Sequence, residues 1–146
     1  MQKIFFLLLA LFCTLGAWAQ KDNIERTWYN AEKTSKIQVY KATDGKFYGK
    51  IVWLQKPNDD SGKPRTDIKN TNEKLRTQPL LNALILKGFS KSKDDANVYE
   101  GGTVYDPNSG KTYCGKLTLN GKEIKLKGFI CGFSLLGRSS TWTLAE

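Results

Sequence analysis

The sequence predicts an all-β protein, a single antiparallel up-and-down barrel of about eight strands. Short runs of alternating β-type residues dominate it, and no stretch keeps a 3.6-residue helical period. Most runs are joined by turn-like connections, which imply that consecutive strands are antiparallel neighbours. The clearest hairpin has one apolar and one charged face, and a sheet of that kind curls over its dry face until its edges meet.

Residues 1–19 have the features of a cleaved export signal. Lys3 supplies a basic start, Ile4–Leu15 is almost entirely apolar, and Ala17-Trp18-Ala19 is an A-x-A cleavage site. The apolar run has about 12 residues, against roughly 20 that a membrane-spanning helix needs. We therefore expect a mature chain that starts at Gln20, does not span a membrane, and is exported to the periplasm or the cell exterior.

Eight strands are expected along residues 20–146, which we interpret as one β-barrel domain. Each run is rich in β-branched or aromatic residues and is bounded by Gly, Asn or Asp. The expected strands are Arg26–Asn30, Lys36–Lys41, Lys46–Leu54, Ala83–Phe89, Val98–Tyr105, Lys111–Leu119, Lys122–Ile130 and Ser139–Leu144. Inward positions at Gly49, Gly101, Gly115 and Gly128 suit the sharp bends that barrel closure requires.

The one long connection is Gln55–Asn82, which makes it the candidate for a lid across one mouth of the barrel. It is rich in Asp and Asn, but it lacks the D-x-[DN]-x-[DN]-G frame of a calcium loop. Asn and Asp also form turns and helix caps. We therefore expect no metal site there, and nothing in the chain implies a cofactor.

The Asn120-Gly121 pair predicts a type I′ hairpin, because both central positions of that turn need positive φ. In the resulting register Leu119 faces Lys122 and Leu117 faces Ile124. The apolar residues of this hairpin then share the inner face, and its lysines share the outer face.

The same register bears on Cys114 and Cys131, the two cysteines downstream of the signal. An oxidising compartment favours a disulfide between them. However, Cys114 would face Lys127, which leaves Cys131 four residues further on, about 13 Å away. A disulfide needs Cα atoms within about 7 Å, so the pair forms only if the chain bulges or turns back after Gly128. The sequence leaves the pairing open.

Five blocks in order resemble the bacterial domain-of-unknown-function family 2147. They are Thr27-Trp28, FYGKIVW at Phe47–Trp53, Asp67 with Asn70, EGGTVYDPNSGKTY at Glu100–Tyr113, and GRSSTWT at Gly137–Thr143. The resemblance covers essentially all of the mature chain and implies an exported, lipocalin-like barrel. It brings no established activity with it.

The same resemblance suggests a role for Trp28 and Arg138. They are spaced like the Trp and the basic residue that close the bottom of lipocalin-like barrels, where the guanidinium stacks on the indole. The alternative is that Arg138 points into the cavity and pairs with a ligand carboxylate or phosphate. We expect the structural role.

Composition narrows the function classes. The chain has 146 residues and no His, which excludes His-dependent nucleophile pairs and His-ligated zinc. The formal net charge is +9, or +8 once Lys3 is removed with the signal. Such a charge attracts anionic surfaces, and an exported protein meets envelope lipids before nucleic acid. We expect a monomer without a nucleic-acid partner.

Three functions follow from these observations. The leading one is the binding of a small amphipathic ligand in a barrel lined by aromatic residues, with Arg138 at the polar end of the barrel. The other candidate contacts with the ligand are Trp53, Tyr105, Tyr113 and Trp142. The second is a non-enzymatic envelope protein that associates with anionic surfaces, or a structural domain with a filled core. The third, an enzyme that uses Asp67, Glu100 and Asp106 as acids, is disfavoured because these residues come from separate segments.

Overall fold

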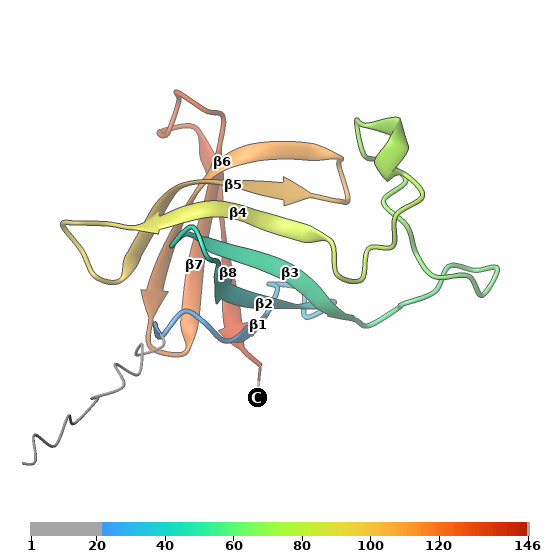
Figure 1. Ribbon diagram of the computed structural model, residues 1–146, viewed down its shortest axis with the longest axis horizontal. Helices are drawn as coiled ribbons and strands as arrows, with labels where there is room; N and C mark the ends of the chain where they lie inside the picture. Colours follow the sequence, from blue (N-terminus) through green and yellow to red (C-terminus); the bar gives the residue numbers. More distant parts are fainter. Residues whose placement is uncertain (1–21, 146) are drawn as a thin grey trace, which may run out of the picture.

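A computed structural model describes residues 22–145 and shows a closed antiparallel barrel of eight strands. The predicted signal at residues 1–19 lies outside the described part. Figure 1 labels the strands, which are β1 (Thr27–Tyr29), β2 (Ser35–Lys41), β3 (Phe47–Leu54), β4 (Leu84–Lys91), β5 (Val98–Asp106), β6 (Lys111–Asn120), β7 (Glu123–Phe129) and β8 (Gly137–Leu144). A single 3-10 turn, η1 (Glu73–Leu75), lies in the long connection after β3.

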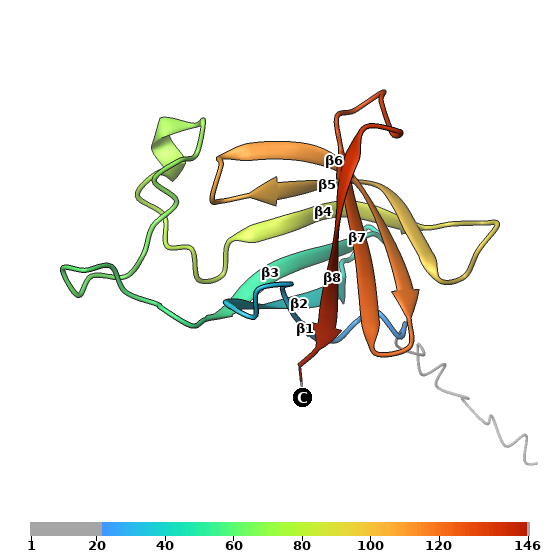
Figure 2. The same cartoon turned by 180° about the vertical axis from the view of Figure 1, so that it is seen from behind.

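Each strand pairs with the next along the chain, and β1 pairs with β8 to close the barrel. The prediction of an up-and-down barrel is confirmed, and all eight expected strands are present. Figure 2 shows β7 and β8 crossing steeply in front of β2–β6, as expected for tilted strands that wrap round a small core. Within residues 22–145, no helix is long and apolar enough to cross a membrane.

The predicted register of the β6–β7 hairpin is wrong by two residues. Asn120 pairs with Glu123 and Leu119 with Ile124, so the two loop residues are Gly121 and Lys122. Gly121 has φ +58°, whereas Lys122 is not among the residues with positive φ. This is the sign pattern of a type II′ turn, which needs a glycine only at its first central position. A shift of two preserves the faces, so the apolar residues still point inward.

The register shift also changes the distance between the two cysteines. Cys114 pairs with Phe129 rather than with Lys127, which places Cys131 only two residues beyond its partner. The chain then turns back, and the Phe133 N–H donates to the Ile130 carbonyl. The structure joins Cys114 and Cys131 in a disulfide, with Cα atoms 5.1 Å apart.

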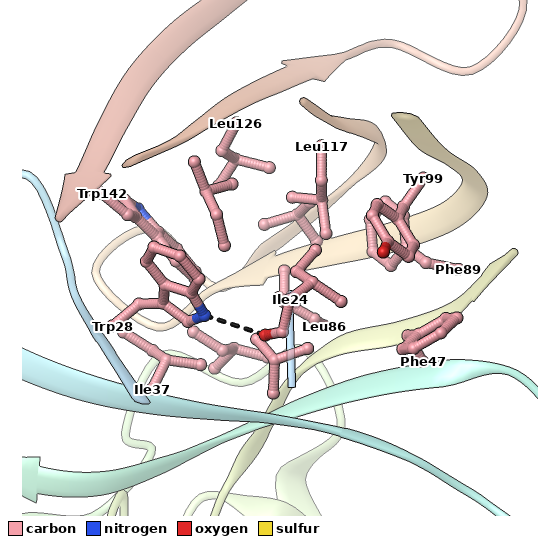
Figure 3. Close-up of a cluster of buried hydrophobic side chains, with 14 of the residues drawn as sticks. Ile24, Trp28, Ile37, Phe47, Leu86, Phe89, Tyr99, Leu117, Leu126 and Trp142 are labelled. Atoms are coloured by element: carbon pink, nitrogen blue, oxygen red, sulfur yellow. Dashed lines mark hydrogen bonds between the residues drawn. The ribbon is translucent and has the colours of Figure 1, made fainter. Parts of the chain in front are cut away.

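The core fills one end of the barrel, which we call the closed end. Figure 3 shows Phe47, Phe89 and Tyr99 packed together there, with Phe47 and Tyr99 edge to face at 4.9 Å. The segment before β1 plugs this end: Ile24 is fully buried, and its carbonyl accepts a hydrogen bond from Trp28 Nε1 at 3.0 Å.

Glycines make room for this packing. A Cβ at Gly115 would lie 2.7 Å from the Phe89 ring, and one at Gly102 would lie 2.7 Å from the Lys87 carbonyl oxygen and closer still to Phe89. The expectation that Gly101 points inward is wrong. A bulge between Glu100 and Gly102, with Gly101 at φ +76°, turns Gly101 outward and Gly102 inward.

Candidate ligand-binding cavity

The opposite end of the barrel, which we call the open end, contains a cavity of about 480 Å³. Its wall includes residues from the β1–β2 turn, the long connection, the β5–β6 turn and the start of β8. Eight-stranded barrels are either filled by side chains or leave space for one small ligand. This barrel is filled at the closed end and hollow at the open end.

The deep wall of the cavity is apolar. Its side chains come from β2, β3, β4, β5, β7 and β8, and each exposes less than a tenth of its surface; they are Ile37, Ile51, Ile85, Val104, Leu126 and Trp142. Side chains along a strand point alternately into and out of the barrel, and these six point inward. A ligand that reaches this depth is surrounded by hydrocarbon and one indole.

The mouth of the cavity is polar. β8 contributes Arg138 to it, and the long connection contributes Arg65. The acidic residues of the lining are Glu32 and Asp106. Within residues 22–145, neither arginine makes a salt bridge or a side-chain hydrogen bond. Both guanidinium groups are therefore available to an anionic group that enters the mouth.

Tyr105 and Asp67 connect the long connection to the cavity wall. The Tyr105 hydroxyl donates to Asp67 Oδ1 at 2.7 Å, and Asn70 Nδ2 donates to Asp67 Oδ2 at 2.7 Å. Asp67 is only 6% exposed. Burial, together with the hydrogen bond to this carboxylate, raises the pKa of Tyr105 to about 12. Tyr105 is thus a neutral hydrogen-bond donor over the physiological range.

A second anchor lies beside the first. Lys69 Nζ donates to the Asn108 carbonyl at 2.6 Å, and the Lys69 backbone runs so close to Gly110 that a Cβ there would overlap its carbonyl. The long connection also adds Arg65 and Leu80 to the cavity lining. The segment expected to be a lid therefore forms part of one wall, held by side-chain and backbone contacts.

The structure brings together four of the five predicted contact residues. Arg138, Tyr105, Tyr113 and Trp142 all line the cavity. Trp53 does not line it and stands on the outer surface of the barrel, 38% exposed, where it packs edge to face against Tyr29. A register shift at Lys36/Ile37 in the β2–β3 pairing accompanies this outward placement.

The predicted stacking of Arg138 on Trp28 is wrong. Trp28 pairs with Leu144 at the far end of β8, whereas Arg138 pairs with Gly128 at the beginning of that strand. Six residues of strand, about 20 Å, separate the two positions. The Trp28 indole N–H instead donates to the Ile24 carbonyl. Arg138 lies at the mouth of the cavity, where its alternative role, pairing with a ligand anion, would place it.

Sequence reasoning missed Arg65, Leu80, Glu32 and Ser140, all of which line the cavity. Ser140 could have been found, since it lies between Arg138 and Trp142 on the inward phase of β8. Arg65 and Leu80 carry no such signal, because the long connection has no strand or helix period.

The three acids considered for an enzyme are not gathered in one place. Glu100 is exposed and pairs with Ser90 and Lys116 away from the mouth, while Asp67 and Asp106 lie near Tyr105. Among the described residues, no group of three or more Cys, Asp or Glu side chains is placed to hold a metal ion.

A family model described as "Uncharacterized protein conserved in bacteria (DUF2147)" matches residues 16–144. The chain belongs to this family. The match extends across the whole barrel, which agrees with the resemblance seen in the five sequence blocks. Among curated proteins, none matches the chain.

A solved structure supports the fold. It is that of protein HP1028 from the human pathogen Helicobacter pylori, described as belonging to the lipocalin family. The two structures superpose with a TM-score of 0.68 at 22% sequence identity, over 84% of this chain and 83% of that one. This family member therefore has a lipocalin-like barrel.

Proposed function

We propose that this protein binds a small amphipathic or lipid-like molecule in the open-end cavity, as a non-enzymatic carrier or receptor. The observation that carries the proposal is the polarity of the cavity, an apolar deep wall beneath a mouth with two unpaired arginines. Its volume of about 480 Å³ lies within the range of about 300–1,000 Å³ typical of ligand pockets.

The polarity also favours one orientation and one class of ligand. A hydrocarbon chain gains most by leaving water for the region around Ile85, Leu126 and Trp142. A carboxylate or phosphate at the other end then meets Arg138 and Arg65, and a guanidinium binds either group through two parallel hydrogen bonds. We therefore infer an anionic headgroup.

Dodecanoate and its neutral counterpart dodecanol test this proposal. The expected result is that Arg138→Gln weakens dodecanoate binding by about tenfold or more, since a hydrogen bond to a charged group is worth about 1.5–3 kcal/mol. Dodecanol binding should change little. Lys127→Gln is the matched control, because Lys127 pairs with Ser139 beside Arg138 but is not part of the cavity lining.

Calorimetry or the fluorescence of Trp142 would report binding of both probes. If neither probe binds, or if Arg138→Gln weakens the acid and the alcohol equally, the proposal fails. Native mass spectrometry of protein purified without detergent from its own envelope is complementary, and a reproducible adduct of lipid mass would support it.

The proposed location follows from the sequence features of residues 1–19. We propose that the chain is exported and that the mature form begins at Gln20. The mass of the protein recovered from a secreting host checks this, and a retained Met1 would refute it.

A further inference from the structure

The loop between β7 and β8, Ile130–Leu136, exposes large apolar side chains, and we call it the apolar loop. Ile130, Phe133, Leu135 and Leu136 are 61%, 62%, 93% and 70% exposed. Nine large hydrophobic residues are exposed in the described part of the chain, and four of them fall within these seven positions. Scattered exposed apolar residues are ordinary, whereas a contiguous group marks a contact surface.

The apolar loop is held in place. Its backbone forms two successive turns, with hydrogen bonds from Phe133 N to the Ile130 carbonyl and from Leu136 N to the Phe133 carbonyl. The disulfide from Cys131 to Cys114 ties it to β6. Figures 1 and 2 both show it projecting away from the body of the barrel, between the end of β7 and the start of β8. Its apolar side chains are therefore presented to solvent by a constrained backbone.

The charges beside the loop have one sign. No acidic residue occurs between Glu123 and Glu146, while Lys125, Lys127 and Arg138 flank the loop on its two strands. The side chain of Lys127 runs beside Gly137, where its Cε would lie 3.1 Å from an added Cβ. An apolar tip with a basic collar is complementary to a bilayer surface that contains anionic lipids.

A second copy of the chain is a poorer partner. Each mature copy has a formal net charge of +8, and two apolar loops brought together would also bring their basic flanks together. A lipid surface removes the same side chains from water and neutralises the flanks.

We propose that the apolar loop is a membrane-docking element, which inserts Phe133, Leu135 and Leu136 among the headgroups of an anionic lipid bilayer. Arg138 and Ser139, which follow the loop, line the cavity mouth, so docking would bring that mouth close to the lipid. The inference rests on the loop itself and holds whether or not the cavity binds the proposed ligand.

Co-sedimentation of the oxidised mature protein with vesicles tests the proposal. Vesicles of phosphatidylglycerol with phosphatidylethanolamine are compared with vesicles of phosphatidylcholine alone. We expect stronger binding to the anionic vesicles, and we expect Leu135→Ser with Leu136→Ser to reduce it by about tenfold or more, because two leucines no longer leave water.

Ile68→Ser is the matched control, since Ile68 is as exposed as Leu136, at 70%, but lies in the long connection. It should leave vesicle binding within about twofold of the original protein. In a Phe133→Trp variant, brominated lipids should quench the added indole. Because all these side chains are exposed, the urea unfolding midpoint of each variant should match that of the original protein.

Three results would overturn the proposal. The first is that the protein does not bind anionic vesicles, and the second is that the double variant binds them as well as the original protein does. The third is that light scattering shows a dimer of the original protein and a monomer of the double variant. Dodecanoate binding, measured in the same variants, separates this outcome from the proposed function. Loss of vesicle binding with intact dodecanoate binding assigns the defect to the loop, and the reverse assigns it to the cavity.

Discussion

Removing the Tyr105 hydroxyl should release the long connection from the barrel. In Tyr105→Phe, Oδ1 of the buried Asp67 loses the hydrogen bond of 2.7 Å from the Tyr105 hydroxyl, while Asn70 still donates to Oδ2. A hydrogen bond to a charged group contributes about 1.5–3 kcal/mol. If the connection opens without unfolding the barrel, its opening equilibrium should rise by about 10- to 100-fold.

Native-state hydrogen exchange measures this opening directly. The Asp67 N–H bonds to the Gln78 carbonyl at 3.0 Å and the Leu80 N–H to the Arg65 carbonyl at 2.9 Å, so both amides should exchange faster by that factor. Amides of the β6–β7 hairpin should keep their rates, because they open only with the barrel.

Tyr113→Phe is the matched control for this experiment. Tyr113 also lines the cavity, but its hydroxyl makes no side-chain hydrogen bond within residues 22–145. It should leave the exchange of the long connection unchanged. Equal acceleration in both variants, or no acceleration in Tyr105→Phe, would refute the role assigned to the Tyr105–Asp67 bond.

Two further predictions concern the core and the tyrosines. Gly102→Ala should destabilise the protein by about 1–3 kcal/mol in urea unfolding, because the added Cβ would overlap Phe89. Gly128→Ala should be neutral or slightly stabilising, because the atom nearest to its added Cβ is 3.7 Å away, an ordinary contact distance. Equal losses of stability in the two variants would contradict this packing. Burial raises the pKa of Tyr99 and Tyr105 to about 12 in the folded state. Their stabilising contribution is then complete below about pH 10, the unfolded value, and is lost as the pH rises through 12. A spectrophotometric titration of tyrosinate that shows both residues ionised at pH 10 in the folded protein would refute the shift.

Local sequence patterns were sufficient to predict the strands, because alternation and turn residues act between neighbours in the chain. The inward placement of Leu117, Leu119, Ile124 and Leu126 is correct even though the hairpin register was wrong by two residues. A strand repeats its faces every two residues, so such an error changes partners without changing burial. Arg138 became a candidate for the cavity through the family resemblance and its charge, and Trp142 through its aromatic side chain; both line the cavity from β8.

Contacts between residues far apart in the chain depend on the folded arrangement and could not be predicted from residue patterns. The Cys114–Cys131 disulfide follows from the true register and the turn after Phe129, neither of which a residue pattern encodes. The anchoring of Asp67 by Tyr105 spans 38 residues, across a connection without any period. Residue patterns alone predicted a barrel whose strands have one apolar face. When that barrel closes, Arg138 lies at one end of β8 and Trp28 lies beside the other end. The Arg138 guanidinium is therefore at the cavity mouth and does not stack on the Trp28 indole.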